Sequence, residues 1–229
     1  MKVLVLSSGG VDSTTALGLA VDRYGKDNVM ALSVFYGQRH DKEVKASRKV
    51  AEYYGIEWIS LDLEKIFTFS DSSLLKHSHR DIPEKSYGQQ IRVEGEELIS
   101  TYVPFRNGLF LSTAASIAMS RHCDVIYYGI HSDDVAETAY PDCSSVFNNA
   151  MGTAIWEGSG RQLKIEAPFV NMKKADIIRI GLDLKVPYEL TWSCYEGGEK
   201  PCGKCATCID RRAAFEANGV QDPAFGENE

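Results

Sequence analysis

The chain has 229 residues, of which 44% are hydrophobic and 25% charged, and 32 acidic against 25 basic residues give it a formal net charge of −7. This size and composition predict a single globular domain over residues 1–229 and exclude a collagen-like, repeat-built or disordered chain. The acidic balance argues against a nucleic-acid partner, and the lack of an apolar run near the roughly twenty residues of a membrane span predicts a cytoplasmic protein without a membrane partner.

Short apolar runs alternate with stretches of helical periodicity along most of the chain. Strands are predicted at residues 3–6, 29–35, 58–63 and 125–130, and helices at residues 12–24, 41–54, 108–121, 173–184 and 209–217. This alternation predicts an α/β fold with a doubly wound, mostly parallel sheet, because parallel strands need crossover connections. Residues 70–97 are polar and lack a sustained period, which predicts a long loop over the active site.

The first chemical signal is the sequence SGGVDS at residues 8–13, between the first predicted strand and the first predicted helix. Backbone amides at a helix N-terminus bind anions, and glycines let the backbone approach an oxyanion closely. Asp12 suits such a site if Mg²⁺ bridges it to phosphate oxygens. The segment is neither a Walker A loop nor a Gly-x-Gly-x-x-Gly fingerprint. The alternative interpretation is a plain Gly-Gly turn with a helix cap.

This motif resembles the PP-loop ATP pyrophosphatases, which include GMP synthetase, NAD synthetase, argininosuccinate synthetase and the tRNA-thiolating enzymes. The resemblance implies cleavage of ATP between its α- and β-phosphates, transfer of AMP to a substrate oxygen, and Mg²⁺ held by Asp12 directly or through water. The residues it implies as ATP contacts are Ser7, Ser8, Gly9, Gly10, Val11, Asp12, Ser13, Thr14, Thr15, Ala16 and Leu17.

The second signal is a group of four cysteines within residues 194–208, namely Cys194, Cys202, Cys205 and Cys208. Their spacing matches a zinc site with four thiolate ligands, and Gly203 suits the short turn of such a knuckle. An iron–sulfur cluster needs the same ligand set, and unligated buried thiols are the third interpretation. We predict a structural Zn²⁺, because four protein ligands leave no open position for catalysis.

Further segments extend the resemblance over nearly the whole chain: residues 36–40 with Glu43, 102–112, 140–143, 167–169 before Lys174, and 186–195. Together they resemble the QueC family, the 7-cyano-7-deazaguanine synthases of queuosine and archaeosine biosynthesis. The resemblance implies that 7-carboxy-7-deazaguanine is adenylated by ATP, that ammonia displaces AMP to give an amide, and that a second ATP activates the amide oxygen for dehydration to the nitrile. It also implies a homodimer.

Three side chains are predicted to take part in the chemistry. Asp12 is the expected Mg²⁺ ligand. Arg106 is the expected pyrophosphate or nucleotide contact, because Pro104 fixes the loop before a helix start; the alternative is a surface arginine. Lys174 is expected to reach phosphate from a helix N-terminus, and otherwise is a solvated lysine of the first turn.

Four further side chains are predicted to contact the substrate. Gln38 and His40 follow the second predicted strand, at the sheet edge where open α/β sheets bind ligands, although they could equally stabilise the loop itself. Asn107 follows Arg106 in the segment that leads into the helix predicted at 108–121, and Asp142 either orients the substrate base, binds metal or caps a helix.

Two departures from the family pattern leave other functions open. Val11 stands where the family usually has Gln, and Ser144 stands where Arg commonly follows the Pro-Asp-Cys motif. One alternative is a related enzyme that transfers the deazaguanine acyl adenylate to another amine, for example on a protein. Two alternatives do not depend on these departures: a tRNA sulfurtransferase with the same loop, and a non-enzymatic nucleotide-sensing or zinc scaffold module.

Overall fold

A five-stranded parallel sheet forms the centre of the computed structural model, which describes residues 1–86, 89–90, 98–132 and 140–226. The sheet order is β3-β2-β1-β4-β5, and every one of its strand pairs is parallel. The strands are β1 (Val3–Leu6), β2 (Val29–Phe35), β3 (Glu57–Asp62), β4 (Val125–Tyr127) and β5 (Lys164–Glu166). The predicted α/β class and doubly wound parallel sheet are confirmed.

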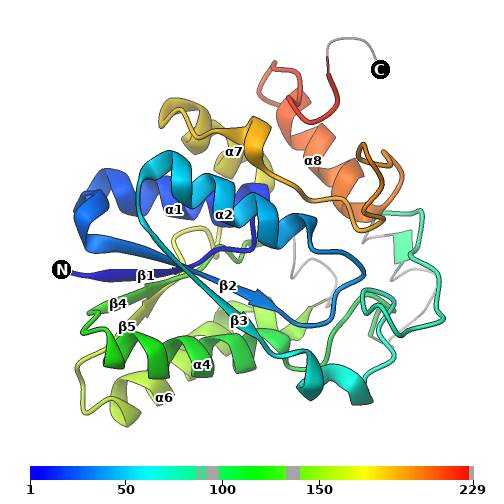
Figure 1. Cartoon of the computed structure of the whole chain (residues 1–229). Helices are drawn as coiled ribbons and strands as arrows, with labels where there is room; N and C mark the ends of the chain where they lie inside the picture. The colour runs from blue at the N-terminus through cyan, green and yellow to red at the C-terminus, as the bar shows by residue number, and fades with distance from the viewer. Residues whose placement is uncertain (87–88, 91–97, 133–139, 227–229) are drawn as a thin grey trace.

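Helices cover both faces of this sheet (Figure 1). The α-helices are α1 (Val11–Tyr24), α2 (Lys42–Tyr54), α4 (Arg106–Ser120), α6 (Ser145–Gly158), α7 (Lys174–Asp183) and α8 (Ala206–Glu216). The 3-10 helices are η1 (Lys26–Asn28), η2 (Glu64–Phe69), η4 (Pro141–Cys143) and η5 (Tyr188–Leu190). Alternate residues of a strand point to opposite faces, so Val3 and Val5 pack against α1, α2 and α7, whereas Leu4 packs against α4 and α6.

The central strand β1 makes the binding crevice. It pairs with β2 on one side, Val5 opposite Ala31, and with β4 on the other, Val5 opposite Tyr127. The chain therefore turns to opposite sides of β1, and such a switch point opens a crevice at the carboxyl ends of the strands. The sequence SGGVDS lies in that crevice, because it connects β1 to α1.

Two glycines let neighbouring elements approach this crevice closely. Gly9 has φ +90°, and a β-carbon placed on it would lie 2.2 Å from the carbonyl oxygen of Glu43 at the start of α2. A β-carbon on Gly129 would lie 3.0 Å from the carbonyl oxygen of Asp12. A side chain at either position would push α2 or β4 away from the start of α1.

Several element boundaries differ from the sequence prediction. The strand predicted at 125–130 ends at Tyr127, and Gly129 beyond it lies against the backbone of Asp12 at the start of α1. The last helix begins at Ala206 and not at residue 209, so Cys208 is helical. Helix α6 and strand β5 were not predicted. Only Ile155 of α6 is fully buried, and β5 is a three-residue edge strand, so neither has a strong hydrophobic pattern.

The loop predicted at residues 70–97 is described only in part, since residues 87–88 and 91–97 lie outside the described residues. Residues 70–86 contain one isolated antiparallel bridge, between Gln38 and Leu75, and otherwise turns. Leu74 and Leu75 are buried against Tyr36 and Phe67. This part of the segment therefore packs on the connection between β2 and α2.

The C-terminal segment returns to the start of α1. Helix α8 packs beside α7 through a cluster that includes Val11, Ile178 and Phe215. The backbone amide of Trp192 donates to the carbonyl of Gly9 at 2.9 Å, which joins the segment before Cys194 to the β1–α1 loop. Across the described ranges, no helix has the length and hydropathy that crossing a bilayer requires.

Candidate active site

A cavity opens at the carboxyl ends of β1, β2 and β4, and we call it the strand-end cavity. It lies over the switch point of the sheet, where the crevice of an open α/β fold is expected to bind ligands. Its lining residues are Leu6, Ser7, Ser8, Gly10, Asp12, Ser13, Leu32, Val34, Tyr36, Gln38, Glu43, Arg106, Asn107, Phe110, Tyr128, Gly129, Ile130, Cys143, Lys174, Ser193, Tyr195 and Thr207.

The phosphate loop, residues 8–13, lines this cavity, and the amides that precede α1 donate within the loop itself. The hydroxyl oxygen of Ser13 accepts from the amides of Ser8 at 3.1 Å and Gly9 at 3.2 Å, and that of Ser8 accepts from the amide of Gly10 at 3.3 Å. No side chain caps α1 at Gly10. Because the first amides of a helix have no partner within the helix, and the positive end of its dipole lies there, this end can bind an anion.

The predicted ATP contacts divide into two groups. Ser7, Ser8, Gly10, Asp12 and Ser13 line the cavity, and the backbone of Gly9 packs against α2. The others do not line it and lie in the protein interior: Val11, Thr14, Thr15, Ala16 and Leu17. The helical period explains the division, because only one side of the first turn of α1 faces the cavity.

Asp12 lies beside two basic side chains at the cavity wall. Its Oδ2 is 3.2 Å from Nζ of Lys174 and 3.6 Å from Nε2 of His131. Burial opposes ionisation of this carboxyl, but Lys174 and His131 together hold its pKa well below the ordinary value. Oδ1 is buried and has no hydrogen-bond partner in the described part of the chain. A carboxylate oxygen left in this way fits a divalent cation such as Mg²⁺.

Arg106 begins α4 and reaches the cavity from the opposite side. Its Nη1 donates to the hydroxyl of Tyr36 at 3.2 Å, and its guanidinium lies 5.1 Å from the centre of the Tyr36 ring. Burial works against the charge, but Tyr36 and Asp142 raise the pKa of Arg106. The cavity thus has a cationic group on each side, Lys174 on α7 and Arg106 on α4.

Of the four predicted substrate residues, Gln38 and Asn107 line the cavity. The Oε1 of Gln38 accepts from the amide of Tyr36 at 2.8 Å, which leaves its NH₂ group to donate. The Nδ2 of Asn107 donates to the carbonyl of Asp142 and to the sulfur of Cys143, both at 3.2 Å.

The other two predicted substrate residues, His40 and Asp142, do not line the cavity. His40 has Nε2 2.9 Å from the carbonyl of Cys194, and its Nδ1 accepts from the amide of Lys42 at 3.3 Å. The Oδ2 atom of Asp142 accepts a hydrogen bond of 2.9 Å from the backbone amide of Asn107, so Asp142 caps the start of α4. Both side chains hold together segments that form the cavity wall.

Sequence reasoning did not select Glu43, Ser193, Tyr195 and Thr207 as site residues, although all four line the cavity. Glu43 lies in the first turn of α2. Burial raises the pKa of its carboxyl to about 7; nearby Arg106 lowers this pKa, and Cys194 raises it slightly. Its position after a predicted strand was a usable signal. The other three flank the cysteines, and nothing local in the sequence indicates that this segment meets the phosphate loop.

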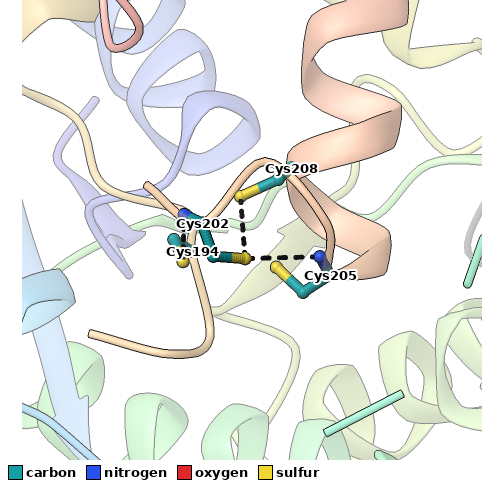
Figure 2. Close-up of side chains that lie close together, drawn as sticks. All are labelled: Cys194, Cys202, Cys205 and Cys208. Carbon is teal, nitrogen blue, oxygen red and sulfur yellow. Dashed lines mark hydrogen bonds between the residues drawn. The ribbon is translucent and has the colours of Figure 1, made fainter. Parts of the chain in front are cut away.

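The four predicted metal ligands converge in space (Figure 2). The sulfur atoms of Cys194, Cys202, Cys205 and Cys208, the four-cysteine cluster, all lie within 4.8 Å of one another. Backbone amides donate to these sulfurs, from Cys202 to Cys194 at 3.3 Å and from Cys205 to Cys202 at 3.3 Å. Thiolates about 2.3 Å from one zinc ion lie at comparable separations, so the cluster can hold a metal ion.

Comparisons with known proteins agree with this geometry. A family model described as "Queuosine biosynthesis protein QueC" matches residues 2–219. Curated proteins named 7-cyano-7-deazaguanine synthase are similar to the chain: that of Archaeoglobus fulgidus is 40% identical over 100% of this chain and 92% of its own length. That of Thermoplasma acidophilum is 41% identical over 97% of this chain and 90% of its own length.

One solved structure, the U34-tRNA thiolase NcsA from Methanococcus maripaludis with its 4Fe–4S cluster, aligns with a TM-score of 0.48 and 19% identity. That alignment covers 95% of this chain and 66% of the thiolase chain. The family model and the relatives of about 40% identity span almost all of the sequence that forms the cavity. The chain therefore belongs to the QueC family of queuosine biosynthesis proteins and is an enzyme of that family.

Proposed function

We propose that the chain, acting as one domain over residues 1–229, is an ATP-dependent carbon–nitrogen ligase that converts 7-carboxy-7-deazaguanine and ammonia to 7-cyano-7-deazaguanine. The observation that carries the proposal is the uncapped start of α1 beside Asp12 and Lys174, in a chain of the QueC family. An anion site next to a carboxylate with one unpartnered oxygen suits a magnesium nucleotide.

ATP is proposed to bind with its β- and γ-phosphates at the phosphate loop. The first backbone amides of α1, which no side chain caps, would supply donors there, and Lys174 supplies a cation within the same cavity. Asp12 would hold Mg²⁺ through Oδ1, and the ion would neutralise charge that develops on the departing pyrophosphate. Arg106, on the opposite wall, is placed to bind the negative charge of the substrate carboxylate or of the adenylate.

The proposed reaction has two activation steps. A carboxylate oxygen of the substrate attacks the α-phosphorus of ATP, the bond to pyrophosphate breaks, and an acyl adenylate forms. Ammonia adds to the acyl carbon and loses a proton as AMP leaves, which gives the amide. The amide oxygen then attacks the α-phosphorus of a second ATP as pyrophosphate leaves, and loss of AMP with two protons from nitrogen gives the nitrile. Gln38 and Asn107 are the side chains proposed to orient the deazaguanine ring, since both line the cavity.

The four-cysteine cluster is proposed to hold a structural Zn²⁺. The chemistry of the ligands supports this, because four thiols that converge within 4.8 Å would repel one another as thiolates without a cation. The cluster also has no position for a substrate if all four sulfurs bind the metal.

The alternative function, transfer of the acyl adenylate to another amine, was based on Val11 and Ser144, and the structure weakens the argument from Val11. Val11 packs against Ile178 and Phe215, away from the cavity lining. Ser144 accepts from the amide of Phe147 at 3.1 Å and so caps α6. Val11 therefore removes no side chain from the cavity, which weakens the argument for amine transfer from this position.

Mass spectrometry of the products formed from 7-carboxy-7-deazaguanine, MgATP and ammonia tests the proposal. Two AMP are expected per nitrile, because carboxylate and amide oxygens must each leave as AMP. One AMP with an amide or a conjugate as the end product would support the amine-transfer alternative. Formation of ADP would contradict the PP-loop chemistry. The homodimer that the resemblance implies is tested by sedimentation of the same preparation.

A further inference from the structure

Ser193 lies where the phosphate loop meets the segment that leads into the four-cysteine cluster. Its neighbour Trp192 is joined to Gly9 by a backbone hydrogen bond of 2.9 Å, and Ser193 itself lines the strand-end cavity. A β-carbon placed on Gly10 would lie 3.6 Å from Oγ of Ser193 and 3.5 Å from Oγ of Ser8. Two hydroxyl groups therefore lie on the same side of the residue that precedes α1.

The hydrogen bond from Arg211 determines which way the Ser193 hydroxyl can donate. Nη1 of Arg211 is 3.4 Å from Oγ of Ser193. Since a guanidinium has donors only, Ser193 accepts in this contact and its own hydrogen remains available. Over the described ranges, no residue accepts that hydrogen within hydrogen-bond distance. The Ser193 hydroxyl is consequently a free donor at the cavity wall.

Arg211 is itself fixed by buried contacts. Its Nε and Nη2 donate to the two carboxylate oxygens of Asp222 at 2.7 and 2.8 Å, and Nη1 also donates to the hydroxyl of Thr191 at 2.9 Å. Arg211 is 2% exposed and Asp222 is 5% exposed. A two-point ion pair in the interior holds the guanidinium in one orientation, and this ion pair does not involve Thr191.

We propose that Ser193 is a phosphate-binding residue, whose hydroxyl donates to an oxygen of the pyrophosphate part of the nucleotide at the start of α1, beside Ser8. The inference rests on the proposed ATP site and adds a donor to it from the far end of the sequence. An anionic oxygen is the acceptor that suits this place, because the N-terminus of α1 begins at the residue beside it and Lys174 lines the same cavity.

Binding of magnesium pyrophosphate, measured by titration calorimetry on the full-length protein, tests this inference. Ser193→Ala is expected to weaken binding about tenfold, the effect of one lost hydrogen bond to a charged group. Thr191→Val is the matched control. It removes the 2.9 Å hydrogen bond that Nη1 of Arg211 donates to Thr191, but Thr191 does not line the cavity. That variant is expected to bind within about twofold of wild type. Thermal melting of all three proteins reports their folding.

Each outcome has one meaning. Unchanged pyrophosphate affinity in Ser193→Ala overturns the inference about Ser193 and leaves the ATP site intact. An equal loss in Thr191→Val also overturns it, because the effect then comes from loosening the Arg211 contacts. Failure of the wild-type protein to bind magnesium pyrophosphate contradicts the proposed ATP site itself. Selective weakening in Ser193→Ala alone supports the assignment.

Discussion

Asp12 illustrates how far single residues could be interpreted from the sequence. From the sequence SGGVDS we predicted that Asp12 lies beside an anion-binding site. In the structure Asp12 lines the strand-end cavity. Its contacts with His131 and Lys174 could not be predicted, because they join residues more than a hundred positions apart and depend on the register of β4 and the start of α7. Gln38 and His40 show the same limit, since they are two positions apart and only Gln38 reaches the cavity.

Asp12→Asn is expected to lower the rate of AMP formation by about 100-fold or more, because the amide is neutral and a weaker Mg²⁺ ligand. It also removes the negative charge that lies 3.2 Å from Nζ of Lys174. Chromatographic assay of AMP, with circular dichroism as the folding check, measures the effect. Asp22→Asn is the control, since Asp22 is exposed on the same helix. Wild-type turnover in Asp12→Asn would remove Asp12 from the mechanism.

Glu43→Gln is expected to stabilise the fold at alkaline pH. Burial raises the pKa of Glu43 from 4.5 to about 7, so between these values the folded state keeps a proton that the unfolded state has lost. The free energy of unfolding therefore falls as the pH rises from 4.5 to about 7. The Glu43→Gln variant has no carboxyl at this position and does not lose this stability.

The gain of the Glu43→Gln variant should be up to roughly 3 kcal/mol at pH 8 and should fade toward pH 5. Melting curves across this range measure it, with Glu52→Gln, exposed on the same helix, as the control. A gain that does not depend on pH would show that the Glu43 carboxyl is not shifted.

At the level of helices and strands, prediction succeeded where the hydrophobic pattern was strong. The strands at residues 3–6 and 29–35 were predicted with their observed bounds, because both are apolar apart from Ser33 and are buried on two faces. β5 was missed because an edge strand of three residues buries little. The start of α8 was misplaced because Cys205 acts as its N-cap and turns directly into the helix, so the cysteine segment is not all loop.

Gly129→Ala is expected to destabilise the protein by about 1–3 kcal/mol, because the added carbon meets the backbone of Asp12 at 3.0 Å and must displace β4 or α1. Denaturant unfolding measures the change, and weaker binding of magnesium pyrophosphate should accompany it. Gly158→Ala is the control, because a β-carbon at this position would have no other atom within 4 Å. Gly158 lies in α6, where alanine is a better helix former than glycine. Equal stability of the two variants would contradict the close approach.

Over the whole molecule, residues distant in sequence form one site. Its walls come from α1, α2, α4, α7 and the segment around the four-cysteine cluster, and that last wall was not predicted. The sequence indicated a metal site and a phosphate site separately. Their adjacency depends on how α8 packs on α7 and on the start of α1, through side chains such as Phe215 and Ile178, which local patterns do not reveal.

Cys205→Ala is expected to reduce zinc content from one ion per chain and to lower stability by at least about 3 kcal/mol, because structural zinc sites contribute about 10 kcal/mol or more. Elemental analysis and thermal melting measure the two effects. Cys123→Ala is the control, since Cys123 is buried outside the cluster. A brown wild-type protein with visible charge-transfer absorption would indicate an iron–sulfur cluster in place of zinc.

The hydrogen bond between Trp192 and Gly9 has a consequence for synthesis on the ribosome. These two residues are 183 positions apart (192 − 9), which at about 5–20 residues per second is roughly 10 to 40 s of translation. During that interval the phosphate loop has emerged but lacks the segment that covers it. A nascent chain therefore completes this contact only after residue 192 has been synthesised and has left the ribosome, long after the phosphate loop itself.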